Sequence, residues 1–173
     1  GKTFQGFGSE EKPFQGTIKI TNAESGIEIP VNHSFFNYLD QSAKINEGLY
    51  LKAGESLTTP LLAENFVKTS DTAQEASVSL IIDAATDTNS GTGERYSFGG
   101  LIGSMAADTK LSLSVDNKIT DKGQTKVSGI GNLGFFCNTM EAGASLTIAS
   151  YTGDTAYTVL TENGHAGGLV GEM

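Results

Sequence analysis

The sequence predicts an all-β protein whose repeats stack on one another, and three observations lead to this fold class. An apolar pair recurs along the chain, with first members 31, 35, 34 and 34 residues apart. About ten residues after each pair, apolar and polar residues alternate, which indicates a strand with one buried face. The 173 residues include 22 glycines and 3 prolines, which suits short strands joined by tight bends. A period of this length is typical of solenoids and propellers.

Each repeat is expected to contain at least two strands, one at the apolar pair and one at the alternating run. The pairs are Phe35-Phe36, Phe66-Val67, Leu101-Ile102, Phe135-Phe136 and Leu169-Val170. The alternating runs are Ala43 to Ile45, Ala76 to Leu80, Leu111 to Val115 and Ala144 to Ile148. We expect one continuous core that contains Phe35, Phe66, Val78, Leu101, Ile102, Leu113, Phe135, Phe136 and Leu146.

Residues 1–22 are expected to form a hairpin that begins the stack. Phe4, Phe7 and Phe14 are separated by glycines and by a polar turn at residues 9–13, and residues 16–20 then alternate as a strand.

The same region carries a resemblance to a known family. Residues 4–17 read Phe-x-Gly-x-Gly-(x4)-Pro-Phe-x-Gly-Thr, and residues 99–103 and 167–171 read Gly-Gly-Leu-Ile-Gly and Gly-Gly-Leu-Val-Gly. Together these motifs resemble the GLUG-motif repeats of large bacterial surface proteins, over about half the chain. Residues 132–137 are a looser copy, the two upstream pairs match only in register, and residues 21–26 depart from the Asp-Gly-Asn-Gly turn of the family.

The resemblance implies a right-handed parallel β-helix, a solenoid of about five coils, on a secreted or wall-attached bacterial protein. We expect residues 1–173 to form a single solenoid segment, a fragment of a longer repeat protein, because the repeat begun at Gly167 stops at Met173. The alternative is an antiparallel β-sandwich, arranged as two small domains divided near residues 83–94. That alternative explains the strand content but not the common register of the repeats.

The charge of the chain excludes some partners. The net charge is −9, with 20 acidic and 11 basic residues, and Arg95 is the single arginine. Nucleic-acid binding needs lysine and arginine to neutralise phosphates, so no nucleic-acid partner is expected. An anionic membrane surface is disfavoured by the same sign, and no apolar run is long enough for membrane insertion. The expected location is extracellular or at the cell surface.

The alternating runs place small polar residues on one outward face. If the apolar residues point inward, six hydroxyl side chains point outward and stack about 4.8 Å apart in a parallel solenoid. These candidate ligand-binding residues are Ser77, Ser79, Ser112, Ser114, Ser145 and Thr147. The preferred interpretation is a neutral solvated face. The more specific interpretations of this face are a glycan-contact surface, a lateral packing face or an ice-binding face.

Residues 83–94 are the longest stretch without apolar periodicity, and we expect a loop there. Asp83, Asp87 and Asn89 offer oxygen atoms that could bind calcium, which makes calcium the one candidate cofactor. Their order departs from that of an EF-hand, so a solvated loop is the preferred interpretation.

Other reactive residues are expected to be structural. His33 and His165 stand in turns, and Asp40 or Glu28 is near His33 only in sequence. Cys137 lies within an apolar strand, where a free cysteine behaves as a small hydrophobe.

We do not expect an enzyme. A polysaccharide lyase needs a basic residue and calcium, and a hydrolase needs two carboxylates about 5 to 9.5 Å apart. The acidic residues here collect in turns, whereas the strand positions are apolar, Ser, Thr or Lys.

The leading functional hypothesis is a structural or adhesive segment of a surface protein, forming a stiff stalk or binding platform. Its expected partners are neighbouring repeats of the same chain, chains of other surface proteins, or host or cell-wall glycans. The alternatives are a carbohydrate-binding or carbohydrate-active module, or a subunit of a surface assembly. A groove with exposed Tyr50, Tyr96 or Tyr151 would favour sugar binding, and a bare hydroxyl face would favour the stalk.

Overall fold

The computed structural model describes residues 6–20, 26–29, 32–46, 48–53, 57–84, 97–119, 125–153 and 157–173, and the regular elements within them are all β-strands. In chain order these are β1 (Thr17–Lys19), β2 (Ile27–Ile29), β3 (Phe36–Asp40), β4 (Lys44–Asn46), β5 (Leu49–Ala53), β6 (Ala63–Val67), β7 (Ala76–Ala84), β8 (Ser97–Phe98), β9 (Ile102–Met105), β10 (Lys110–Asn117), β11 (Thr125–Gly129), β12 (Leu133–Gly134), β13 (Cys137–Met140), β14 (Ser145–Thr152), β15 (Tyr157–Thr161), β16 (Ala166–Gly167) and β17 (Val170–Glu172).

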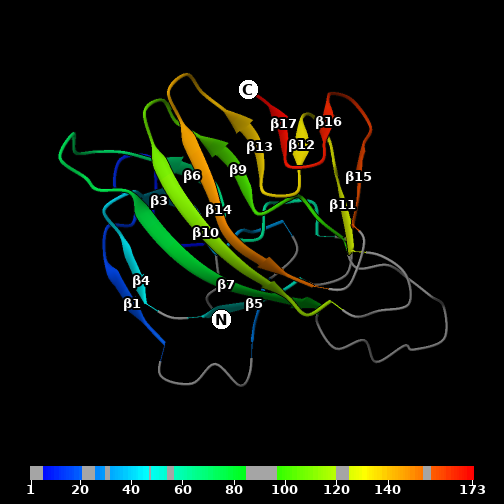
Figure 1. Ribbon diagram of the computed structural model, residues 1–173, viewed down its shortest axis with the longest axis horizontal. Coiled ribbons are helices and arrows are strands. Elements are labelled where there is room, and N and C mark those ends of the chain that lie inside the picture. The colour runs from blue at the N-terminus through cyan, green and yellow to red at the C-terminus, as the bar shows by residue number, and fades with distance from the viewer. Residues whose placement is uncertain are drawn as a thin grey trace.

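The strand pairs in these ranges are all parallel, and they build three main sheets (Figure 1). Sheet 1 has the order β14-β10-β7-β5-β2, sheet 2 the order β17-β13-β9-β6-β3, and sheet 3 the order β15-β11-β8. Two short pairs, β1 with β4 and β12 with β16, complete the pairing. The protein is therefore all-β with successive strands stacked in parallel, and the antiparallel sandwich is wrong for the described residues.

The alternating runs form sheet 1 because every second residue is apolar. In β10 Leu111, Leu113 and Val115 are buried, whereas the serines between them are partly exposed. The predicted register between β7 and β10 is confirmed, with Leu111 paired to Ala76. Leu111 pairs with Leu146 of β14, however, and not with Ala144 as the repeat alignment predicted. This shift of two residues keeps the apolar residues on the inner face.

The apolar pairs form sheet 2, with two corrections to the predicted register. Ile102 pairs with Cys137 and not with Phe136, so the fourth copy of the pair is Phe136-Cys137. Phe36 pairs with Ala63, so the second copy of the pair is Leu62-Ala63 and not Phe66-Val67. Phe66 lies later in β6, where it pairs with Leu39. The alignment assumed nearly equal repeats, whereas the stacked positions 36, 63, 102, 137 and 170 are 27, 39, 35 and 33 residues apart.

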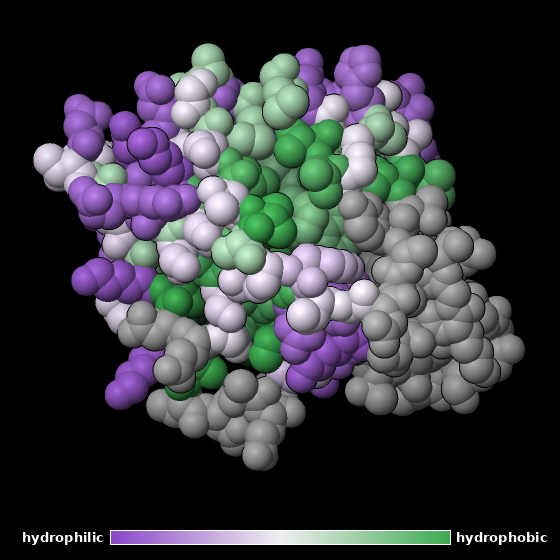
Figure 2. Space-filling view, in the orientation of Figure 1, coloured by the Kyte–Doolittle hydropathy of each residue, from purple (hydrophilic) through white to green (hydrophobic). Residues whose placement is uncertain are grey.

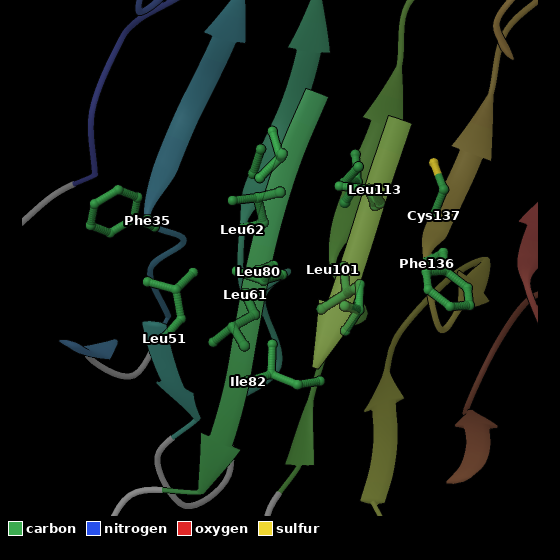
Figure 3. Close-up of a cluster of buried hydrophobic side chains, with 14 of the residues drawn as sticks. Phe35, Leu51, Leu61, Leu62, Leu80, Ile82, Leu101, Leu113, Phe136 and Cys137 are labelled. Carbon is green, nitrogen blue, oxygen red and sulfur yellow. The ribbon is translucent and has the colours of Figure 1, made fainter. Parts of the chain in front are cut away.

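The core is enclosed by sheets 1, 2 and 3. Inner side chains of sheets 1 and 2 face one another across it (Figure 3). The largest fully buried side chains include Phe36, Phe66, Phe98 and Phe135. The nine residues predicted to share one core all belong to this cluster, which confirms that prediction. Leu146 is the one among them that is only partly buried, because it lies in the last strand of sheet 1.

The first Gly-Gly-Leu-Ile-Gly motif needs glycine for two different reasons. Gly100 has a φ of 83°, a conformation that residues with a Cβ rarely adopt. A Cβ on Gly99 would lie 2.1 Å from the Thr58 carbonyl oxygen of the neighbouring repeat. This motif thus provides both a sharp bend and a close approach of backbones.

The first described residues do not form the predicted hairpin. Phe7 bridges Phe36 and Phe14 bridges Leu39, both in parallel, with a turn that begins at Ser9 between the two bridges. β1 then pairs in parallel with β4. This segment lies along β3 as a first, irregular layer of the stack, because its glycines and turn interrupt continuous pairing.

Candidate functional site

The outer face of sheet 1 carries most of the sequence-predicted binding residues. Two rows of hydroxyl side chains cross its strands β7, β10 and β14. One row is Ser77, Ser112 and Thr147, and the other is Ser79, Ser114 and Ser150. Ser112 and Ser114 are partly exposed and the other four are exposed.

Ser145 does not belong to these rows, although the repeat alignment placed it there. It pairs with Lys110, because β14 is shifted by two residues relative to the predicted register. Ser150 takes a place in the second row instead, beyond an irregularity opposite Leu113 and Ser114. Alternation shows which residues share a face but does not locate such a bulge, so the sequence carried no signal for Ser150.

The same outer face continues into a cluster of charged and aromatic residues. Tyr50 donates a hydrogen bond to a carboxylate oxygen of Asp83 at 2.5 Å. The Nζ atoms of Lys52 and Lys118 each lie 5.6 Å from the centre of the Tyr50 ring. Asp116 accepts a hydrogen bond from Thr152 at 2.9 Å and lies 3.9 Å from the Lys118 ammonium group. We call Tyr50, Lys52, Asp83, Asp116, Lys118 and Thr152 the Tyr50 cluster.

Tyr50 is held as a neutral phenol in this cluster. The hydrogen bond to Asp83 raises the pKa of Tyr50 to about 12, and burial and the negative charges of Asp83 and Asp116 act in the same direction. A phenol with this pKa donates hydrogen bonds at neutral pH and is no general base. The cluster can therefore contribute hydrogen bonds and charge to a ligand.

Sequence reasoning missed most of the Tyr50 cluster. The alternation of β10 contained a signal, because Asp116 has the same parity as Ser112 and Ser114 and so faces outward with them. The contact between Tyr50 and Asp83 needed the register between β5 and β7, which pairs Tyr50 with Ile81 and Lys52 with Asp83. Neither strand contains a motif that fixes this register.

The calcium candidates are not brought together in the described residues. Asp83 lies near the end of β7 and bonds to Tyr50, whereas Asp87 and Asn89 fall outside the described residues, as do Arg95 and Tyr96. Within the described ranges, no group of three or more His, Cys, Asp or Glu side chains could hold a metal ion.

Asp40 is buried at the end of β3, where its hydrogen bonds fix a turn. Its two carboxylate oxygens accept bonds from the Ser42 N–H at 2.9 Å, the Ser42 hydroxyl at 2.5 Å and the Thr69 N–H at 2.8 Å. Burial acts to raise the pKa of Asp40, but these hydrogen bonds outweigh it and the pKa is lowered. His33 accepts a bond from Thr59 through its main-chain carbonyl.

A polar crevice of about 460 Å³ lies beside this turn. It is lined by Gln41, Lys68, Asp71, Ala73, Gln74, Glu75, Asp108 and Lys110. Gln41 is buried and its polar atoms bond to main-chain groups of the neighbouring turns. Lys68 forms an ion pair with Asp71 at 3.6 Å. The buried part of this crevice thus holds turns together.

The remaining candidates have structural roles. Cys137 is buried, as expected, and burial raises the pKa of its thiol to about 12. His165 donates its main-chain N–H to Asn132 and accepts from the Leu133 N–H, so its backbone joins neighbouring layers. Tyr151 points inward, where its ring packs edge-on against Phe135 at 5.7 Å.

Comparison with known proteins identifies no relative of this chain. No model of a protein family matches the chain, and neither a curated protein nor a solved structure matches it. Among the described residues, no helix has the length and apolar character needed to cross a membrane.

Proposed function

We propose that this chain is a structural or adhesive segment of a secreted or cell-surface bacterial protein. In this proposal the stacked strands continue as a right-handed parallel β-helix of about five coils, which acts as a stiff stalk or as a binding platform. The observation that carries the proposal is the strand order of sheets 1 and 2. Each contains five parallel strands taken from successive repeats, so every repeat rests on the one before it.

Such a stack supports a stalk for a physical reason. Each repeat contacts its neighbours through main-chain hydrogen bonds in several sheets at once, so bending would break ladders on more than one side. The outer face of sheet 1 is polar and the chain carries a net charge of −9. Both features suit a protein that remains separate in an aqueous extracellular setting.

A second candidate function is glycan binding on the outer face of sheet 1. The observation that favours it is the continuity of the two hydroxyl rows with the Tyr50 cluster across the same strands. Sugars present many hydroxyl groups, and a surface of hydroxyls, carboxylates and ammonium groups offers both donors and acceptors to them. In this proposal the stalk displays the face and the face holds the glycan.

The stalk proposal is tested by lengthening the chain in register. Thr139 pairs with Glu172, so residues 140–172 can follow Glu172 as a further repeat. We expect three added copies to lengthen the monomer by about 14 Å in small-angle scattering, because stacked strands lie about 4.8 Å apart. The melting temperature should rise, since each repeat adds an interface.

The control is the same extended chain with Leu146→Ser and Ile148→Ser in every added copy. It should gain neither length nor thermal stability, because the added strands cannot bury an apolar face. Disordered added copies in the unsubstituted chain would refute the stalk. The surface location has a separate test, in which antibodies against the chain should label intact cells of the source organism. Labelling only after the cells are permeabilised would refute that location.

A further inference from the structure

Four charged side chains form one row across the outer face of sheet 1. Glu28 of β2 pairs with Lys52 of β5, and Lys52 pairs with Asp83 of β7. Lys118 follows β10, and its main-chain N–H donates to the Ile82 carbonyl at 2.7 Å, so it continues the ladder beside Asp83. The charges in this order are negative, positive, negative and positive. We call Glu28, Lys52, Asp83 and Lys118 the charge row.

The charge row is presented at the surface of the protein. Glu28 and Lys118 are exposed, and Lys52 and Asp83 are partly exposed. Opposite charges on adjacent strands attract one another and so support the sheet. Within the described residues, however, Glu28 and Lys52 form no ion pair with each other, although β2 and β5 place them side by side. Figure 2 shows hydrophilic residues where β7 and β10 end in Figure 1.

Two apolar side chains lie beside the centre of the charge row. Tyr50 and Ile81 pair across β5 and β7, and both are partly exposed on the outer face. The other outward residues of β7 are Ser77, Ser79 and Asp83, so Ile81 is an isolated aliphatic side chain on a polar face. An aromatic and an aliphatic residue surrounded by polar ones have the composition of a small interface centre. We call Tyr50 and Ile81 the outer pair.

The charge row is complementary to its own reverse. Two copies can meet through these faces by a two-fold axis that runs along the strands between β5 and β7, with their stacks in opposite directions. Glu28 then faces Lys118 of the second copy, and Lys52 faces Asp83 of the second copy. The two outer pairs meet at the centre, with the tyrosine of one copy against the isoleucine of the other. Stacks in the same direction would place like charges opposite each other, so the row favours the opposed arrangement.

We propose that this chain forms a dimer through the charge row and the outer pair, with the two stacks in opposite directions. The occupant of the face is a second copy of this chain, because the row matches its own reverse at every position. The net charge of −9 keeps copies apart over most of the surface, whereas the two negative and two positive charges of the row cancel. This inference goes beyond the stalk and the glycan face, since neither assigns a second copy to this surface.

The size of the face sets the expected strength of the dimer. Four strands about 4.8 Å apart, each with seven residues of about 3.3 Å rise, cover on the order of 400 Å² in each copy. Interfaces of this size belong to weak and transient complexes, so we expect a Kd on the order of 100 μM. Added salt should weaken the association, because the charges lie at the surface.

The test exchanges charges within the row of the whole chain. Sedimentation velocity follows the wild type from about 5 μM to about 1 mM, a range that brackets the expected Kd. Lys52→Asp and Asp83→Lys each place two like-charged pairs at the centre of the dimer, so each should weaken self-association at least about tenfold. An equimolar mixture of the two variants has opposite charges at every position and should associate as the wild type does.

A second pair of variants guards against a loss of folding. Asp83→Lys removes the hydrogen bond from Tyr50, so Glu28→Lys and Lys118→Asp repeat the exchange at the exposed ends of the row. Thermal unfolding followed by circular dichroism identifies the variants that fold. Lys110→Asp is the matched control, because it makes the same change of charge at the exposed other end of β10.

Two results together support the proposal: recovered association in a mixture of folded variants, and unchanged association of Lys110→Asp. A wild type that stays monomeric up to about 1 mM would overturn it. Dimers that no substitution in the row weakens would also overturn it, because another surface would then hold them. The same holds for mixtures that associate no better than their single variants, and for a Lys110→Asp effect as large as that of Lys52→Asp. The stalk function fails on a different result, the disordered repeats of the lengthened chain.

Discussion

Gln41 and Lys110 are 69 residues apart in sequence, yet the Gln41 side-chain carbonyl accepts the Lys110 main-chain N–H at 2.7 Å. The amide nitrogen of Gln41 donates to the main-chain carbonyls of Ala73 and Gln74 at 3.0 and 2.9 Å. One buried side chain thus joins the turn after β3 to the segments that lead into β7 and β10. This arrangement makes Gln41 a structural residue whose loss affects three layers.

Replacing Gln41 by alanine should destabilise the protein. The change removes three hydrogen bonds from a buried site, and at about 1 kcal/mol each the expected loss is about 3 kcal/mol. Urea unfolding followed by circular dichroism measures it. Gln15→Ala is the matched control, because the Gln15 amide bonds to Thr69 at an exposed position. Equal effects of the two substitutions would contradict the role assigned to Gln41.

Asp40 should make the stability of the protein depend on pH in the acid range. The folded-state pKa of Asp40 lies below its ordinary value of 3.8, so its carboxylate stabilises the fold above that pH. The stabilisation is lost as the pH falls through the lower folded-state value. Asp40→Asn should cost about 1 to 2 kcal/mol at pH 7, and the difference from wild type should shrink below pH 3.8.

The measurement is urea unfolding of both proteins from pH 7 to pH 2.5. Asp71→Asn serves as the control, because the Asp71 side chain is fully exposed and its ion pair with Lys68 contributes little. A difference between wild type and Asp40→Asn that stays constant down to pH 2.5 would show that the charge of Asp40 has no stabilising role.

Two glycines separate the effect of crowding from the effect of backbone conformation. A Cβ at Gly99 would meet the Thr58 carbonyl oxygen at 2.1 Å, and Gly99→Ala should cost about 3 kcal/mol through this overlap. Gly131 has a φ of 89°, and no atom lies within 4 Å of the position that a Cβ would take there, so Gly131→Ala should cost only about 1 kcal/mol. Calorimetry gives both values, and a larger loss at Gly131 would contradict the close packing at Gly99.

Ser34 offers a substitution that should stabilise the fold. Its hydroxyl oxygen is buried and has no hydrogen-bond partner among the described residues. Ser34→Ala removes a desolvated polar group, and we expect a gain of about 1 kcal/mol in the free energy of unfolding. Thr109 is the matched case, because its buried hydroxyl donates to the Ala106 carbonyl at 2.6 Å. Thr109→Val should therefore destabilise, and two changes of the same sign would refute this account.

Cys137 should resist thiol reagents while the protein is folded. Burial raises its pKa from 9.0 to about 12, so at pH 8 the thiolate fraction falls about a thousandfold. Labelling with a chromogenic disulfide should be slow in buffer. It should be fast in about 6 M guanidinium, a concentration at which even very stable domains unfold. Rapid labelling of the folded protein would show that the strand β13 opens readily.

The sequence predicted the fold where alternation is regular, and failed where spacing or register had to be known. Leu111 pairs with Ala76 as the repeat predicted, because β7 and β10 alternate without interruption. The pair at residues 62–63 was missed because unequal loops break the period. For the outer face, alternation identified the serines of β7 and β10. It could not place Ser150 or join Tyr50 to Asp83, since a bulge and a strand register depend on the whole stack.

The unequal spacing of the stacked positions bears on how such a scaffold can diversify. The chain advances by 27 residues from Phe36 to Ala63 and by 39 from Ala63 to Ile102, yet both steps join adjacent strands of sheet 2 in register. Doubling the length of a flexible loop costs only about 0.6 kcal/mol in closure entropy. Insertions between strands can therefore accumulate independently in each repeat. The architecture separates a constant ladder of paired strands from connecting segments that can vary in length.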